Sequence, residues 1–144
     1  MRDIRYRSRI LPQAAKDEML ARLADVLKER SEIVFAYVHG SFVEPGPFRD
    51  LDLAVWVDPK AAPDRHPVDY EIDLALSLQR RLGIPVDVKR LNEAPVGFCY
   101  QAARGLPIMS RDDEVRDTWL ERTRDAYWDF QPVARRHLAE LLRE

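Results

Sequence analysis

Apolar residues recur along the chain at spacings that predict alternating helices and strands. Behind Pro12 they return every three or four residues, which indicates an amphipathic helix with one buried stripe over about residues 12–30. The run 33–38 is continuously apolar, β-branched and aromatic, which favours a strand buried on both faces. That strand should end at His39-Gly40-Ser41.

A second strand and a second helix are predicted next. The segment 51–57 has the two-residue alternation of a strand, which places Asp50 and Asp52 on the same face. After a loop with three prolines, apolar residues at helical spacing predict a helix over about residues 68–82, which Gly83 should end. The apolar positions of this helix are Ile72, Leu74, Leu76, Leu78 and Leu82.

The rest of the chain completes a mixed pattern. We expect a third strand over 84–91, a helix near 93–103 and an extended stretch at 106–109. From Asp112 onward the pattern is helical, and Pro132 should break or kink this run into two pieces. The order predicts an α/β (α+β) fold in which helices flank a small mixed sheet and the C-terminus is helical.

The composition is that of a folded globular chain. It has 144 residues, of which 46% are hydrophobic and 33% charged, and a formal net charge of -2. These values exclude the disordered class, give no overall basic excess for nucleic acid, and predict a single domain over residues 1–144. We expect a cytoplasmic protein away from membranes, because the chain has a lone cysteine, no signal peptide and no apolar run long enough to span a membrane. That cysteine, Cys99, is expected to be a buried small apolar side chain. Four arginines near the N-terminus either bind an acidic partner or RNA, or form a solvated arm: Arg2, Arg5, Arg7 and Arg9.

Three short motifs could carry chemistry together. Asp50 and Asp52 lie on one face of a strand with Cα atoms about 6.5–7 Å apart, and such a carboxylate pair can bind Mg²⁺. Asp87, between two valines of the next strand, could complete a two-metal site, because an ionised carboxylate among apolar residues is costly unless it is paired or binds a metal. Gly40-Ser41 could bind phosphate through backbone amides and the hydroxyl. Taken singly, such motifs are more often a turn or a solvated face than a binding site.

The sequence around these motifs resembles a known family. The segments are Val38-His39-Gly40-Ser41-Phe42, Phe48-Arg49-Asp50-Leu51-Asp52-Leu53-Ala54-Val55 and Pro85-Val86-Asp87-Val88. They are similar to those of the minimal nucleotidyltransferases of the DNA polymerase β superfamily, in particular the MNT-type antitoxins that accompany a HEPN-domain toxin. The likeness extends over nearly the whole chain, including Leu91-Asn92-Glu93-Ala94-Pro95.

The resemblance implies a polymerase β-like fold and a residue-by-residue site. It implies transfer of a nucleoside monophosphate from a nucleoside triphosphate such as ATP, with two Mg²⁺ ions. Gly40 and Ser41 would bind the triphosphate, Asp50 and Asp52 would share the metals, and Asp87 would be the third ligand and candidate base. The loop from Gly40 to Asp50 is shorter than is common in the family, and Arg49 replaces a usual serine, so Arg49 either contacts the triphosphate or lies in solvent.

Three functions remain open at this point. The resemblance implies an antitoxin that adenylylates a tyrosine hydroxyl of a HEPN-type toxin, and the short chain fits an acceptor that supplies its own surface. A non-catalytic antitoxin that blocks its toxin by occlusion is the second reading. The third is a transferase that modifies a small molecule such as an aminoglycoside. His39, beside the Gly-Ser motif, is expected to be structural rather than a base.

The last predicted helices contain a dense group of aromatic residues. Tyr127 and Trp128 project about 100° and 200° from Ala126, so at least one of them should face outward. An exposed aromatic flanked by Arg124 and Arg135 is a candidate docking site for the acceptor protein. The stripe expected to pack on the sheet comprises Val115, Trp119, Ala126, Phe130 and Val133.

Overall fold

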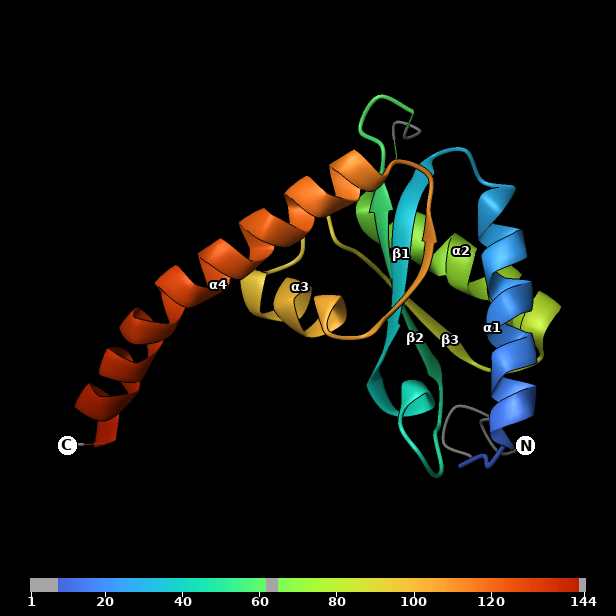
Figure 1. The fold of residues 1–144 in the computed structure, drawn as a ribbon, viewed down its shortest axis with the longest axis horizontal. Coiled ribbons are helices and arrows are strands. Elements are labelled where there is room, and N and C mark those ends of the chain that lie inside the picture. Colours follow the sequence, from blue (N-terminus) through green and yellow to red (C-terminus); the bar gives the residue numbers. More distant parts are fainter. Residues whose placement is uncertain (1–7, 62–64, 143–144) are drawn as a thin grey trace.

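The computed structural model describes residues 8–61 and 65–142, and it consists of a four-stranded sheet between two layers of helices (Figure 1). This arrangement confirms the predicted class, a small mixed sheet flanked by helices with a helical C-terminus. In chain order the elements are α1 (Gln13–Lys28), β1 (Ile33–His39), the short 3-10 helix η2 (Gly40–Val43), β2 (Leu51–Val57), α2 (Pro67–Leu82), β3 (Val86–Arg90), α3 (Val96–Ala103), β4 (Leu106–Ser110) and α4 (Asp113–Leu142).

The sheet has the strand order β3-β2-β1-β4 and is mixed. β1 pairs antiparallel with β2 and with β4, whereas β2 and β3 run parallel. The β2–β3 connection contains α2, as a parallel crossover requires. The parallel register places Leu51 opposite Val86 and Asp52 opposite Asp87. β1 is buried along most of its length, as its continuous apolar run predicts.

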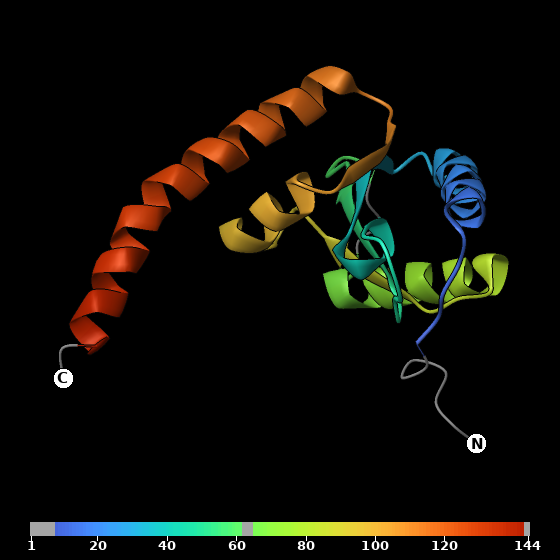
Figure 2. The same ribbon diagram turned by 60° about the horizontal axis from the view of Figure 1, so that its bottom comes forward.

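The two helical layers lie on opposite faces of the sheet (Figure 2). α1 and α2 cover one face, where Leu23, Leu27 and Leu74 join the larger apolar core. α3 and α4 cover the other face through Cys99, Ala102 and Trp119, in a smaller core. Within the described part of the chain, no helix combines the length and apolar character needed to cross a membrane.

Only part of the expected apolar stripe of α2 is buried. Leu74, Leu78 and Leu82 pack into the core, whereas the side chains of Ile72 and Leu76 are about half exposed. Ile72 and Leu76 therefore form a second, partly exposed row on this helix, because two residues along a helix rotate the side chain by about 200°. The helix ends as predicted at a glycine, since Gly83 has a φ of 75°, which favours glycine.

α4 differs from its prediction in two ways. It continues through Pro132 as one helix, and Figure 2 shows it curving away from the domain. Trp119 is buried against Phe35 and Tyr37, as expected, but Phe130 and the remaining stripe residues are exposed, as listed here: Val115, Ala126 and Val133. The expected stripe is wrong except at Trp119: Figure 2 shows α4 extending away from the sheet, and its other four stripe positions are exposed in the part of the chain that the structure describes.

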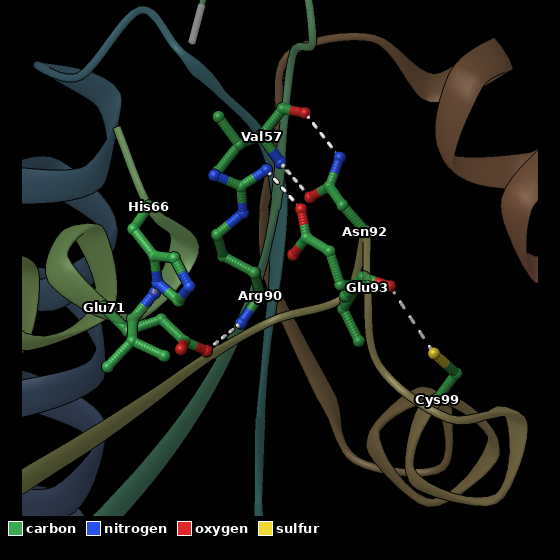
Figure 3. A network of polar contacts seen from close by, with 9 residues as sticks. Val57, His66, Glu71, Arg90, Asn92, Glu93 and Cys99 are labelled. Atoms are coloured by element: carbon green, nitrogen blue, oxygen red, sulfur yellow. Dashed lines mark hydrogen bonds and ion pairs between the residues drawn. The ribbon is translucent and has the colours of Figure 1, made fainter. Parts of the chain in front are cut away.

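A polar network fixes the end of the β2–β3 pair that lies away from the aspartates (Figure 3). The Asn92 side chain accepts a hydrogen bond from the Val57 amide at 3.0 Å and donates one to the Val57 carbonyl at 2.8 Å. The Arg90 amide donates to the Glu71 carboxylate at 2.8 Å. The buried Cys99 thiol donates to the Leu91 carbonyl at 3.7 Å. The network fastens β3 to β2 and α2, and this helps to fix the register that brings Asp52 and Asp87 together.

Candidate active site

Three carboxylates meet on one face of the sheet. Asp50 directly precedes β2 and Asp52 lies in that strand, so the strand period turns both side chains the same way. Asp87 comes from β3, where the parallel register places it beside Asp52. One carboxylate oxygen from each residue lies within 4.8 Å of the other two. The structure therefore brings together the three aspartates singled out in the sequence.

The electrostatics of this cluster are those of a cation site. Asp52 is half-buried, and its burial, together with the negative charges of Asp50 and Asp87, raises its pKa to about 6. Asp87 is exposed, so the sequence argument that its charge lies among apolar side chains is wrong. Its carboxylate instead lies close to those of Asp50 and Asp52. A divalent cation among the three would remove this repulsion, and an all-oxygen donor set fits Mg²⁺.

The Gly40-Ser41 turn lies against the aspartates. Gly40 has a φ of 78°, and a Cβ at this position would overlap the Asp52 carboxylate. Glycine is thus required both by the backbone conformation and by the close approach. Ser41 is partly buried in η2, and its carbonyl accepts a hydrogen bond from the Glu44 amide at 3.1 Å. The turn therefore lies directly beside the Asp52 carboxylate.

His39 joins the aspartates from β1. It lies opposite Asp52 in the antiparallel register, and its ring packs edge-on against Phe98 with centroids 5.3 Å apart. Burial lowers the pKa of His39, while the charges of Asp87 and Asp50 oppose that shift. This packing supports the structural reading of His39.

Residues to which the sequence argument gave no role in the site hold the loop in place. Phe42 and Phe48 are buried and meet edge-to-face with centroids 4.8 Å apart. Arg9 pairs with Phe48 through two backbone hydrogen bonds of 2.8 and 2.9 Å, so the backbone at Arg9 is not part of a solvated arm. The neighbouring Arg49 is exposed, and its contact with a triphosphate stays a prediction. The other N-terminal arginines, Arg2, Arg5 and Arg7, lie outside the described residues.

A cavity of about 330 Å³ lies elsewhere on the molecule. Trp56, Trp119 and Arg122 contribute to its lining. Trp56 is four residues beyond Asp52 along β2, which separates the cavity from the aspartates by roughly 13 Å of strand. The chemistry of the three carboxylates and the glycine turn, rather than this cavity, identifies the candidate active site.

More than half of the chain matches a known protein family. A family model described as "Polymerase beta, Nucleotidyltransferase" matches residues 21–114, which is more than half of the chain. None of the curated proteins matches the sequence.

Solved structures share the fold at low sequence identity. One is a chain from a complex of tri-AMPylated Shewanella oneidensis HEPN toxin with MNT antitoxin, 17% identical, with a TM-score of 0.69 over 88% of this chain and 98% of that one. Another is a chain from the toxin–antitoxin pair MntA–HepT, 17% identical, with a TM-score of 0.65 over 91% and 99%. A third comes from a toxin–antitoxin structure with AMP-PNP, 18% identical, with a TM-score of 0.66 over 92% and 99%.

Proposed function

Because this chain belongs to the polymerase β nucleotidyltransferase family, we propose that it transfers AMP from ATP to a protein hydroxyl. The acceptor is a tyrosine of a cognate HEPN-type toxin, and the chain thereby acts as the antitoxin of the pair. The observation that carries this proposal is the convergence of Asp50, Asp52 and Asp87 beside the Gly40-Ser41 turn.

Each group of the site has a role in this reaction. Asp50, Asp52 and Asp87 would hold Mg²⁺, with two ions expected, and the metal would supply charge neutralisation for the phosphates and for the reacting oxygens. The backbone amides of the turn and the Ser41 hydroxyl donate hydrogen bonds to the triphosphate. Gly40 keeps the turn close to Asp52 without a side chain between them.

The transfer step needs only ATP and the acceptor hydroxyl as reactants. The acceptor hydroxyl oxygen forms a bond to the α-phosphorus of ATP, and the bond from that phosphorus to the bridging oxygen of the β-phosphate breaks. Pyrophosphate leaves, and the hydroxyl proton passes to a base for which Asp87, the exposed member of the cluster, is the candidate. The protein's contribution is to position the phosphates and the acceptor.

The fold neighbours support a protein acceptor. Their descriptions name an AMPylated HEPN toxin in complex with an MNT antitoxin, and a toxin–antitoxin structure with AMP-PNP. Beyond β4, the described part of this chain contains only α4, so a separate macromolecule would supply the acceptor surface.

The test is a transfer assay with three acceptors. The chain is incubated with Mg²⁺ and ATP labelled at the α-phosphate, together with a HEPN-type toxin, with an aminoglycoside, or with neither. We expect label on a tyrosine of the protein, located by mass spectrometry, and no transfer after chelation of the metal. Neutralisation of the toxin without label would support occlusion instead, and label on the aminoglycoside would support small-molecule transfer.

A further inference from the structure

A lysine is buried on the apolar face of α1. Lys16 precedes Leu20 by four residues and Leu23 by seven, so it lies on the stripe that faces the core. Its exposed fraction is 3%. Lysine is almost never fully buried without a partner, because moving an ammonium group out of water is costly. The partner of Lys16 therefore identifies what the residue does.

The ammonium group of Lys16 contacts the loop that carries the proposed triphosphate site. Nζ donates a hydrogen bond to the Glu44 carbonyl at 3.0 Å, directly after η2. It also lies 5.5 Å from the ring centroid of Phe42 and 5.3 Å from that of Phe48, within the range of cation–π attraction. Phe42 lies one residue after Ser41, and Phe48 lies two residues before Asp50. One side chain of α1 thus binds the start, the middle and the end of the loop.

An apolar residue could fill this place without the cost of burying a charge. A leucine at position 16 would complete the stripe of α1, but it could not donate to the Glu44 carbonyl or attract the two rings. Segment 43–47 of this loop is exposed, so its own side chains contribute little packing against the core. The position of the turn beside Asp52 depends on how this loop is fastened.

We propose that Lys16 is a positioning residue for nucleotide binding. Its ammonium group holds the loop 40–48 in the conformation that presents Gly40 and Ser41 to the triphosphate. The inference rests on the proposed function. It means that a residue of α1, outside the loop, holds the loop in its conformation. Lys16 does not touch the nucleotide, so its removal should weaken nucleotide binding while the three aspartates stay in place.

The test compares two substitutions at position 16 with a control on the same helix. Lys16→Met keeps the aliphatic stem and removes the charge, Lys16→Arg keeps the charge and a donor, and Lys28→Met removes an exposed charge from the last turn. Binding of a non-hydrolysable ATP analogue with Mg²⁺ is measured by calorimetry, and KM and kcat are measured in the transfer assay. Hydrogen exchange is followed separately for amides of the loop and of β1.

For Lys16→Met we expect analogue affinity to fall and KM for ATP to rise by about tenfold, inside the hundredfold that a misplacement of about 1 Å can cause. kcat should change much less. Loop amides should exchange faster while β1 amides keep their protection. Lys16→Arg should recover most of the affinity, and Lys28→Met should behave as the wild type.

The outcomes separate this inference from the proposed function. A folded Lys16→Met variant with wild-type affinity and wild-type loop exchange would overturn the role of Lys16 alone. A wild-type chain that binds the analogue but labels no protein would overturn only the proposed acceptor, and one that binds no analogue would overturn both. If Lys16→Met does not fold, Phe48→Leu removes one ring beside the ammonium group, and the same loss of affinity with an intact sheet is expected.

Discussion

Replacing Asp52 by asparagine should abolish transfer and stabilise the metal-free protein. The substitution keeps the shape of the side chain and removes one of three crowded negative charges. In the wild type, burial raises the folded-state pKa of Asp52 from 3.8 to about 6, with further contributions from the negative charges of Asp50 and Asp87. A raised carboxyl pKa means that the folded state disfavours the charged form, so the wild type loses stability as pH rises from about 4 to about 6.

The size of the effect follows from this shift. About two pKa units at 1.36 kcal/mol each would give about 3 kcal/mol at neutral pH, but the carboxylate is half exposed and solvent screens it. We therefore expect Asp52→Asn to be more stable by about 1 kcal/mol above pH 6, which corresponds to a rise in Tm of about 3 °C for a chain of this length. Below pH 4 the difference should vanish, because the wild-type side chain is then neutral as well.

The assay is thermal unfolding at pH 4 and pH 7, with chelator and with saturating Mg²⁺. Magnesium should raise the Tm of the wild type and leave that of the variant nearly unchanged, since only the wild type retains the full ligand set. Asp25→Asn, which removes an exposed carboxylate on α1, is the control for the change in net charge. Strong destabilisation of Asp52→Asn at pH 7 without metal would refute the reasoning and identify the cluster as a structural network, and retained transfer would refute the metal role.

Three further substitutions test other parts of the structure. Gly40→Ala should abolish transfer and lower the unfolding free energy by about 2 kcal/mol, because a Cβ would be strained at this φ and would displace Asp52; activity and urea unfolding measure this. Trp128→Ala, at a side chain that is 60% exposed, should weaken partner binding by about 2 kcal/mol and leave binding of the ATP analogue unchanged, as calorimetry would show. Asn92→Ala leaves the Val57 amide and carbonyl without their partner and should cost about 2 kcal/mol in urea unfolding, whereas a neutral result would mean that water replaces the side chain.

The aromatic residues of α4 show what a helical pattern can and cannot predict about burial. The angular argument that Tyr127 and Trp128 cannot share a narrow stripe is confirmed, since Trp128 is exposed while Tyr127 stacks on Tyr100 with ring centroids 3.7 Å apart. The prediction that Phe130 is buried was wrong, because a helical pattern gives the angle of a side chain around its helix but not whether another element lies opposite it. That depends on where the helix leaves the domain.

Patterns among residues close in sequence were sufficient to predict most helices and strands and the shared orientation of Asp50 and Asp52. The period of a strand alone places Asp50 and Asp52 on one face, because successive side chains alternate about the backbone. The end of α2 at Gly83 and the strand nature of 33–38 also follow from the residues themselves, through the left-handed φ of glycine and the length of the apolar run. These features depend on neighbours in sequence, which the chain fixes directly.

The remaining features depend on contacts between residues far apart in the chain. Asp87 meets Asp52 only because β3 pairs parallel to β2 in one register, and a shift by a single residue would turn it to the other face. Its exposure could not be read from its apolar neighbours, because alternate residues of an edge strand face different surroundings. Lys16 lies on a stripe whose spacing reveals a misplaced charge, but its purpose appears only when the Glu44 carbonyl and two phenylalanine rings converge on it. Sequence fixes the direction of a side chain within its own element, and the packing of elements decides what that side chain meets.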